Sequence, residues 1–143
     1  MDYTQTVDIM FDVVNTAWTE HSTAILGSPA IIQWPKVEKE DPPPNDDFWL
    51  QVRILTLSEE QKSLKNVNTC YETSGLLLLL INAPKSDAQF RKAMSIANLM
   101  KNEFKGLRIG DLKFLKSQIQ ESDPEEKDYA VLISVNYEHF FSI

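Results

Sequence analysis

Few side chains in this sequence could carry out catalysis, and those few stand far apart along the chain. The two histidines are His21 and His139, and the single cysteine is Cys70. No Ser-His-Asp, Cys-His or H-E-x-x-H arrangement is present, and no histidine or basic cluster near Cys70 in sequence would activate its thiol. We expect His21 to lie at the end of a first helix, where it complements the terminal carbonyls, and His139 and Cys70 to be structural residues of strands. The chain is therefore not expected to be an enzyme.

Acidic side chains are concentrated in two runs, residues 38–47 and 121–128. The second run contains "DPEEKD", which lacks the D-x-D-x-D-G spacing and the closing glutamate of a calcium loop. The four glycines form neither a G-x-G nor a G-x-x-x-x-G-K phosphate-binding motif. Both acidic runs are interpreted as solvated loops, and no metal or cofactor is expected.

Basic side chains gather weakly in and around a predicted second helix. They are Lys85, Arg91, Lys92, Lys101, Lys105 and Arg108. A solvent-exposed stripe is the favoured interpretation, with a salt-bridging surface for an acidic partner as the alternative. The formal net charge of -7 argues against sequence-independent binding of nucleic acid and against docking on an anionic membrane.

Two features bear on the compartment in which the protein works. One cysteine excludes an internal disulfide and a multi-cysteine zinc site, and it fits a reducing cytoplasm. The first ten residues, MDYTQTVDIM, lack the basic region and apolar core of a secretory signal. We therefore expect the protein to stay in the compartment where it is made.

The most hydrophobic segment is the run Leu76 to Leu80, inside "YETSGLLLLLINAPKSD". It is far shorter than the roughly 20 apolar residues of a membrane helix. Pro84 and a new helix signal follow it at once, which favours a buried strand over residues 71–81 rather than a short buried helix. Gly75 would then mark a bulge or a close approach of another segment.

The sequence predicts two amphipathic helices. The apolar stripe of the first is Val7, Met10, Phe11, Val14, Ala17 and Trp18, and Thr4 or Thr6 could cap its start. The second begins at a capping box of Ser86 and Gln89, with Asp87 in its first turn, and ends at Gly106. Its stripe is Phe90, Ala93, Met94, Ala97, Met100 and Phe104.

The remaining segments predict a mainly antiparallel sheet of about four to five strands. Residues 48–57 should pair with 70–81, and 112–120 with 129–140, and "AIIQW" at 30–34 is a short strand candidate. Two helices on one face of this sheet define an α+β, two-layer sandwich in one domain over residues 1–143. Loops are expected to project at 35–47, which contains three consecutive prolines, and at 58–68.

The order of these segments, and the glycine and proline breaks between them, resemble those of the phage tail-terminator family, the small tail-completion proteins of long-tailed phages. The match runs from the N-terminal helix through "IIQWP", "FWLQVRILTL", "SEEQKSLKN" and "YETSGLLLLLINAPKSD". It continues through "AQFRKAMSIANLMKNEFKG" and the last two strands, and so covers nearly the whole chain.

The resemblance implies a two-layer α+β domain that assembles into a hexameric ring. Such a ring caps the tail tube, stops its polymerisation and joins the tail to the head connector, while genome DNA passes through its lumen without specific binding. The implied partners are the major tail tube protein and a head-completion or connector protein. The implied location is the head–tail junction of the virion, after synthesis in the cytoplasm of the host bacterium.

The family supplies no motif that assigns individual interface residues, so these come from the sequence alone. Long projecting loops and exposed strand edges suit contacts between subunits. Helices on only one face would also leave alternate leucines of the run 76–80 to be covered by loops or by a neighbouring subunit. The expected interface residues are Lys36, Glu38, Glu40, Trp49, Glu59, Glu60, Lys62, Lys65, Asp123 and Glu125.

Two alternatives remain open at this point. One is another neck, head-completion or tail-tube-like structural protein of the same kind of particle. The other, from a different class, is a small ligand-binding α+β domain, which would need a pocket with convergent polar groups.

Overall fold

A computed structural model describes residues 3–27, 30–34, 48–61, 70–84, 86–121 and 129–142. The helices are α1 (Tyr3–Leu26) and α2 (Asp87–Phe104). The strands are β1 (Ile31–Gln33), β2 (Trp49–Gln61), β3 (Cys70–Ala83), β4 (Arg108–Ile109), β5 (Leu112–Glu121) and β6 (Tyr129–Ser142). They form one sheet in the order β1-β2-β3-β6-β5-β4. All neighbours are antiparallel except β1 and β2, which are parallel.

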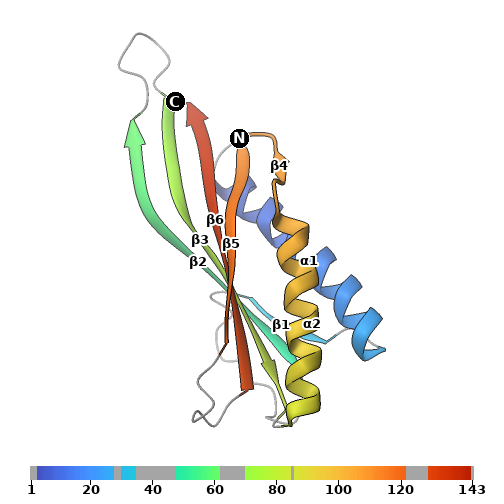
Figure 1. Cartoon of the computed structure of the whole chain (residues 1–143). Helices are drawn as coiled ribbons and strands as arrows, with labels where there is room; N and C mark the ends of the chain where they lie inside the picture. The colour runs from blue at the N-terminus through green and yellow to red at the C-terminus, as the bar shows by residue number, and fades with distance from the viewer. Residues whose placement is uncertain are drawn as a thin grey trace.

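Both helices lie on the same face of this sheet, as Figure 1 shows. Helix α2 packs on β3, β5 and β6, and α1 packs on α2. The predicted α+β two-layer architecture and both predicted hairpin pairings are confirmed. The sheet has six strands among the described residues instead of four to five, because the sequence did not reveal the two-residue strand β4.

Helix α1 buries most of its predicted stripe, since Met10, Val14 and Trp18 are fully buried. The indole nitrogen Nε1 of Trp18 donates a hydrogen bond of 2.9 Å to the carbonyl of Ala30, which ties the helix to the residue just before β1. The predicted caps are wrong: α1 begins at Tyr3, so both Thr4 and Thr6 lie inside its first turn. Thr6 is buried there.

Helix α2 begins and ends where the sequence predicts. The Ser86 hydroxyl oxygen accepts a hydrogen bond of 3.3 Å from the backbone N–H of Gln89. Only this half of the capping box forms, because the buried Gln89 Oε1 has no hydrogen-bond partner among the described residues. Gly106 adopts a positive φ of 70° just past the helix, a conformation that glycine tolerates best. Within the helix, Ile96 is fully buried beside the predicted stripe.

The leucine run alternates between the two faces of β3, as a strand requires. Leu77, Leu79 and Ile81 are fully buried on the face that the helices cover. Leu76, Leu78 and Leu80 point to the opposite face and are partly exposed. Strand β3 lies between β2 and β6 in the sheet, so the predicted strand is confirmed.

The sheet bends where two strands change register in the same row. Thr56, Gly75, Tyr137 and Phe114 lie side by side across β2, β3, β6 and β5, and the register shifts directly after Thr56 and after Phe114. Bulges bend a strand and increase its twist. Figure 1 shows β2 and β3 curving away from the helices toward the upper end of the sheet. Gly75 thus lies opposite the bulge of β2 and against Tyr137, in agreement with the predicted bulge or close approach.

Candidate functional site

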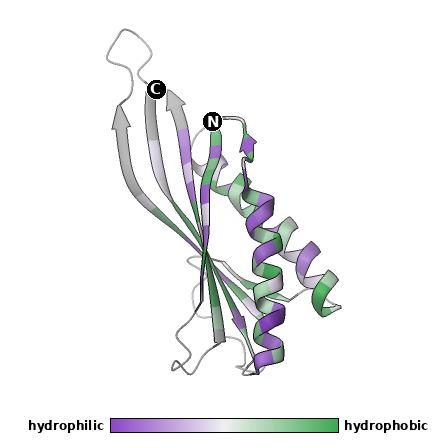
Figure 2. Ribbon diagram, viewed as in Figure 1, coloured by the Kyte–Doolittle hydropathy of each residue, from purple (hydrophilic) through white to green (hydrophobic). Residues whose placement is uncertain are grey.

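The sheet face turned away from the helices, called the outer face below, has no helix over it in the described part of the chain. Its residues alternate with the core residues of β1, β2, β3 and β6. They are Ile31, Trp49, Gln51, Arg53, Leu55, Leu76, Leu78, Leu80, Leu132, Ser134 and Asn136. In Figure 2 the hydrophobic colouring extends along the lower part of the sheet, on strands that lie beside the helices.

Leucines form the middle of the outer face. The register places Gln51, Leu80 and Leu132 in one row across β2, β3 and β6, and Leu55 beside Leu76 further along. Leu55 is 46% exposed, and Leu76 and Leu80 are partly exposed. Each of these rows, like the row between them, also contains a polar residue, Gln51, Arg53 or Asn136. Partly exposed leucines bordered by polar residues are typical of a surface that binds another molecule.

Both borders of the sheet include strand edges that lack a partner in the described ranges. Strand β1 pairs only with Trp49–Gln51 of β2. On the other border, β4 pairs only with Leu112 and Lys113 of β5. Unpaired N–H and C=O groups along such an edge can bind another chain, and the two borders of this sheet belong to different strands.

Three of the predicted interface residues lie in the described ranges, and the other seven lie outside them. Trp49 opens β2 and is half-buried on the outer face. Glu59 and Glu60 are not in a loop: they extend β2 and pair with Thr73 and Glu72. The others, Lys36, Glu38, Glu40, Lys62, Lys65, Asp123 and Glu125, lie outside the described residues, as do the predicted loop at 35–47 and most of the acidic turn at 121–128.

Trp49 is therefore the predicted interface residue that the structure places on the outer face. The leucines around it were not among the predicted interface residues, although the strand predicted for "GLLLLLI" already implied that alternate leucines would need cover on this face.

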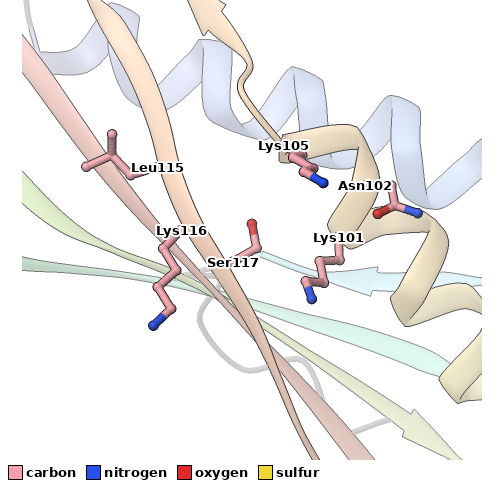
Figure 3. Close-up of a pocket in the computed structure, with 6 residues that line it drawn as sticks. All are labelled: Lys101, Asn102, Lys105, Leu115, Lys116 and Ser117. Atoms are coloured by element: carbon pink, nitrogen blue, oxygen red, sulfur yellow. The ribbon is translucent and has the colours of Figure 1, made fainter.

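A hollow of about 330 Å³ lies between the end of α2 and the bulged part of β5 (Figure 3). Its lining residues are Lys101, Asn102, Lys105, Leu115, Lys116 and Ser117. Lys101 and Lys105 come from α2, and Ser117 points from β5 into the space between the two elements. In this view Lys116 extends on the other side of β5. The Ser117 hydroxyl oxygen is buried and has no hydrogen-bond partner in the described ranges.

The hollow changes the interpretation of the basic residues around α2. Arg91, Lys92 and Arg108 are exposed, as the predicted solvent-exposed stripe requires, and Lys85 lies outside the described residues. Lys101 and Lys105 instead line the hollow together with Ser117 of β5. The sequence could not show this, because the bulge that places Ser117 there arises from the strand register.

The histidines and the cysteine lie mostly in the predicted elements. Cys70 begins β3, and His139 is fully buried in β6 between Thr73 and Leu112 of the neighbouring strands. His21 is not in the last turn of α1, because the helix continues to Leu26. Its Nε2 instead lies 3.1 Å from Oε1 of Glu103 on α2, a contact between residues far apart in sequence.

Comparison with known proteins establishes the fold. No protein-family model matches the chain, and no curated protein matches it. Solved structures do: 21 chains match. One of them, whose name describes no function, has a TM-score of 0.60 and 15% sequence identity. The alignment covers 94% of this chain and 95% of that chain. At this identity the likeness establishes the fold alone.

The helices were also compared with the requirements of a membrane span. Neither α1 nor α2, the helices of the described residues, combines the length and apolarity that crossing a bilayer demands.

Proposed function

We propose that this chain is a structural virion protein, a tail terminator that forms a hexameric ring on the end of the tail tube of a long-tailed phage. The ring stops polymerisation of the tube and presents a surface to the head connector. The observation that carries the proposal is the outer face, whose partly exposed leucines have no helix over them in the described part of the chain.

The energetics of the outer face favour association. Fully burying a leucine side chain contributes about 1.5–3 kcal/mol. The central leucines Leu76, Leu78 and Leu80 are already partly covered, so each would contribute a fraction of that amount. A neighbouring subunit that covers all three leucines would add these contributions to the free energy of association. The loss of translational and rotational freedom on association opposes them.

The borders of the sheet support a ring rather than a two-fold dimer. In a ring, each subunit presents two different patches to its two neighbours. Within the described ranges, the outer edges of β2 and β5 lie on opposite borders of the sheet, and each pairs over only part of its length with a short strand. Two dissimilar edges are what a head-to-tail contact uses.

Two further features suit a ring on a tail tube. The upper ends of β2 and β3 extend past the helices (Figure 1), where they can reach a neighbouring assembly. The net charge of -7 suits a channel that DNA passes through, because cationic side chains would hold its phosphates.

The proposal is tested by measuring the mass of the purified protein, alone and mixed with tail-tube protein. A hexamer in either sample, located at tube ends by electron microscopy, is the expected result. A protein that stays monomeric in both samples contradicts the proposal. A ring that binds no tube, but binds the head connector, would point instead to another neck or head-completion protein.

The hollow lined by lysines favours a second candidate function, a domain that binds a small anionic ligand. The α2 residues Lys101 and Lys105 line it without a carboxylate among the lining residues that the structure describes, and ammonium groups bind phosphate and carboxylate groups. Calorimetric titration with inorganic phosphate tests this candidate. Binding that the double variant Lys101→Gln, Lys105→Gln loses would support it, and absence of heat at millimolar phosphate would exclude it.

A further inference from the structure

Three potential metal ligands from two helices meet beside the α1–α2 contact. They are Glu20 and His21 of α1 and Glu103 of α2, and one ligand atom from each lies within 4.8 Å of the other two. His21 Nε2 and Glu103 Oε1 are 3.1 Å apart. The fold creates this cluster, since Glu103 is 82 positions from His21 in the chain.

Burial and charge at the cluster favour a bound cation. The His21 side chain is only 12% exposed, whereas that of Glu103 is 47% exposed, so the imidazole is held while the carboxylate can adjust. Two carboxylates and a neutral imidazole carry a formal charge of about −2. Glu103 also lies in the last turn of α2, where the carbonyl end of the helix dipole attracts positive charge.

We propose that Glu20, His21 and Glu103 bind one divalent transition-metal ion, which ties α1 to α2. One imidazole nitrogen with two carboxylate oxygens is a ligand set for Zn²⁺ or for Co²⁺, Ni²⁺ and Mn²⁺, whereas Mg²⁺ and Ca²⁺ prefer oxygen alone. Bonds of about 2.0–2.2 Å in a tetrahedral site separate the ligand atoms by about 3.4 Å. Rotation of the exposed glutamates would bring the atoms from their present separations to that value, and water would complete the coordination.

The competing explanation is a plain ion pair between His21 and Glu103. An ion pair does not need Glu20, whereas a three-ligand site does. Replacing Glu20 therefore separates the two explanations. The proposal is independent of ring assembly, because all three residues belong to one subunit.

The test uses the full chain without a histidine tag, freed of metal and titrated with Zn²⁺ and Co²⁺. We expect calorimetry to give one Zn²⁺ per chain, the melting temperature to rise on binding, and Co²⁺ to produce visible absorption bands. The chain has only two histidines, so imidazole-nitrogen NMR reports on the site directly. Zn²⁺ should shift the His21 signals and leave those of buried His139 unchanged.

The variants Glu20→Gln, Glu103→Gln and His21→Ala should each weaken Zn²⁺ binding by at least tenfold, while Asp12→Asn on an exposed position of α1 should leave it unchanged. The glutamine variants keep the size of exposed side chains, so they remain informative if His21→Ala does not fold. Failure to bind Zn²⁺ at 1 mM overturns the proposal, as does binding that survives Glu20→Gln and Glu103→Gln. Shifts confined to His139 would overturn it as well.

Discussion

The phenol of Tyr137 lies where a side chain at Gly75 would be. A Cβ atom built on Gly75 would stand 2.6 Å from the Tyr137 hydroxyl oxygen and would overlap the carbonyl oxygen of Leu55. Gly75 and Tyr137 are paired neighbours on β3 and β6, in the row where β2 and β5 change register. The glycine therefore lets a buried aromatic ring and two bulges occupy one level of the sheet.

The substitution Gly75→Ala is expected to destabilise the fold. The new methyl group would have to displace Tyr137 and the backbone at Leu55, and overpacking of this kind costs about 1–3 kcal/mol. Urea denaturation measures the loss. Adding Tyr137→Phe removes the closest side-chain atom and should recover part of it. Gly75→Ala with the stability of the natural chain would show that this row is less crowded than the geometry implies.

Leu79 and Leu78 provide a matched test of which face of β3 is the core. Leu79 is fully buried and pairs with Val52 and Ile133, so Leu79→Ala should cost about 2–5 kcal/mol. Leu78 is partly exposed on the outer face, so Leu78→Ala should cost distinctly less. Denaturation of both variants at a concentration where the protein is monomeric gives the comparison. Equal losses would contradict the observed alternation.

The sequence predicts most of the fold because its signals are local. The helix α2 is marked by Ser86 and Gly106 at its ends, and β3 by length and by the break at Pro84. Such signals depend on a few neighbouring residues, so they can be read without knowing the tertiary structure. The predicted cap of α1 was wrong because Thr4 and Thr6 lie inside the helix. A threonine near a helix start can occupy either the capping position or the first turn, and the sequence alone does not distinguish the two.

The candidate sites were harder to predict because they depend on contacts between distant segments. The hollow needs Lys101 of α2 and Ser117 of β5 together, and the latter position depends on a register shift that has no sequence marker. The His21–Glu103 contact depends on how α1 packs against α2. The sequence did predict that alternate leucines of β3 would need cover, since that follows from the period of a strand alone.

The half-formed capping box of α2 predicts that substitutions of its two residues will have unequal effects on stability. Ser86→Ala removes the oxygen that accepts from the Gln89 N–H, and loss of such a cap costs about 1 kcal/mol. Gln89→Ala should change stability much less, because Gln89 Oε1 has no hydrogen-bond partner among the described residues. Thermal or urea unfolding of the two variants distinguishes them. A loss at Gln89 as large as that at Ser86 would indicate that the reciprocal bond forms in solution.

A charge on the outer face should block assembly while sparing the fold. Leu78→Lys places an ammonium group in the middle of the outer face, between Arg53 and Ser134 in the register, where a neighbouring subunit would have to bury it. Leu99→Lys is the matched control, since Leu99 is an exposed leucine on α2. Light scattering should give a ring for the control and a monomer for Leu78→Lys, each with the circular dichroism of the natural chain. A ring formed by Leu78→Lys would exclude the outer face as the interface.

Shortening the hairpin of β2 and β3 tests whether its tip contributes to assembly. Because Glu59 and Glu60 belong to β2, deleting them would remove paired strand, so the change is better confined to residues 62–69, which keeps Cys70 of β3 paired with Ser142. Gln61 and Tyr71 are paired, and an Asn-Gly dipeptide placed before Cys70 gives a three-residue hairpin loop between them. We expect this variant to fold normally but to assemble poorly on tail tubes, as measured by the mass of the mixture. The full-length variant Lys62→Ser, Lys65→Ser separates the charge of the segment from its length. A shortened chain that assembles as well as the natural one would remove this segment from the interface, and a chain that fails to fold would place it in the core instead.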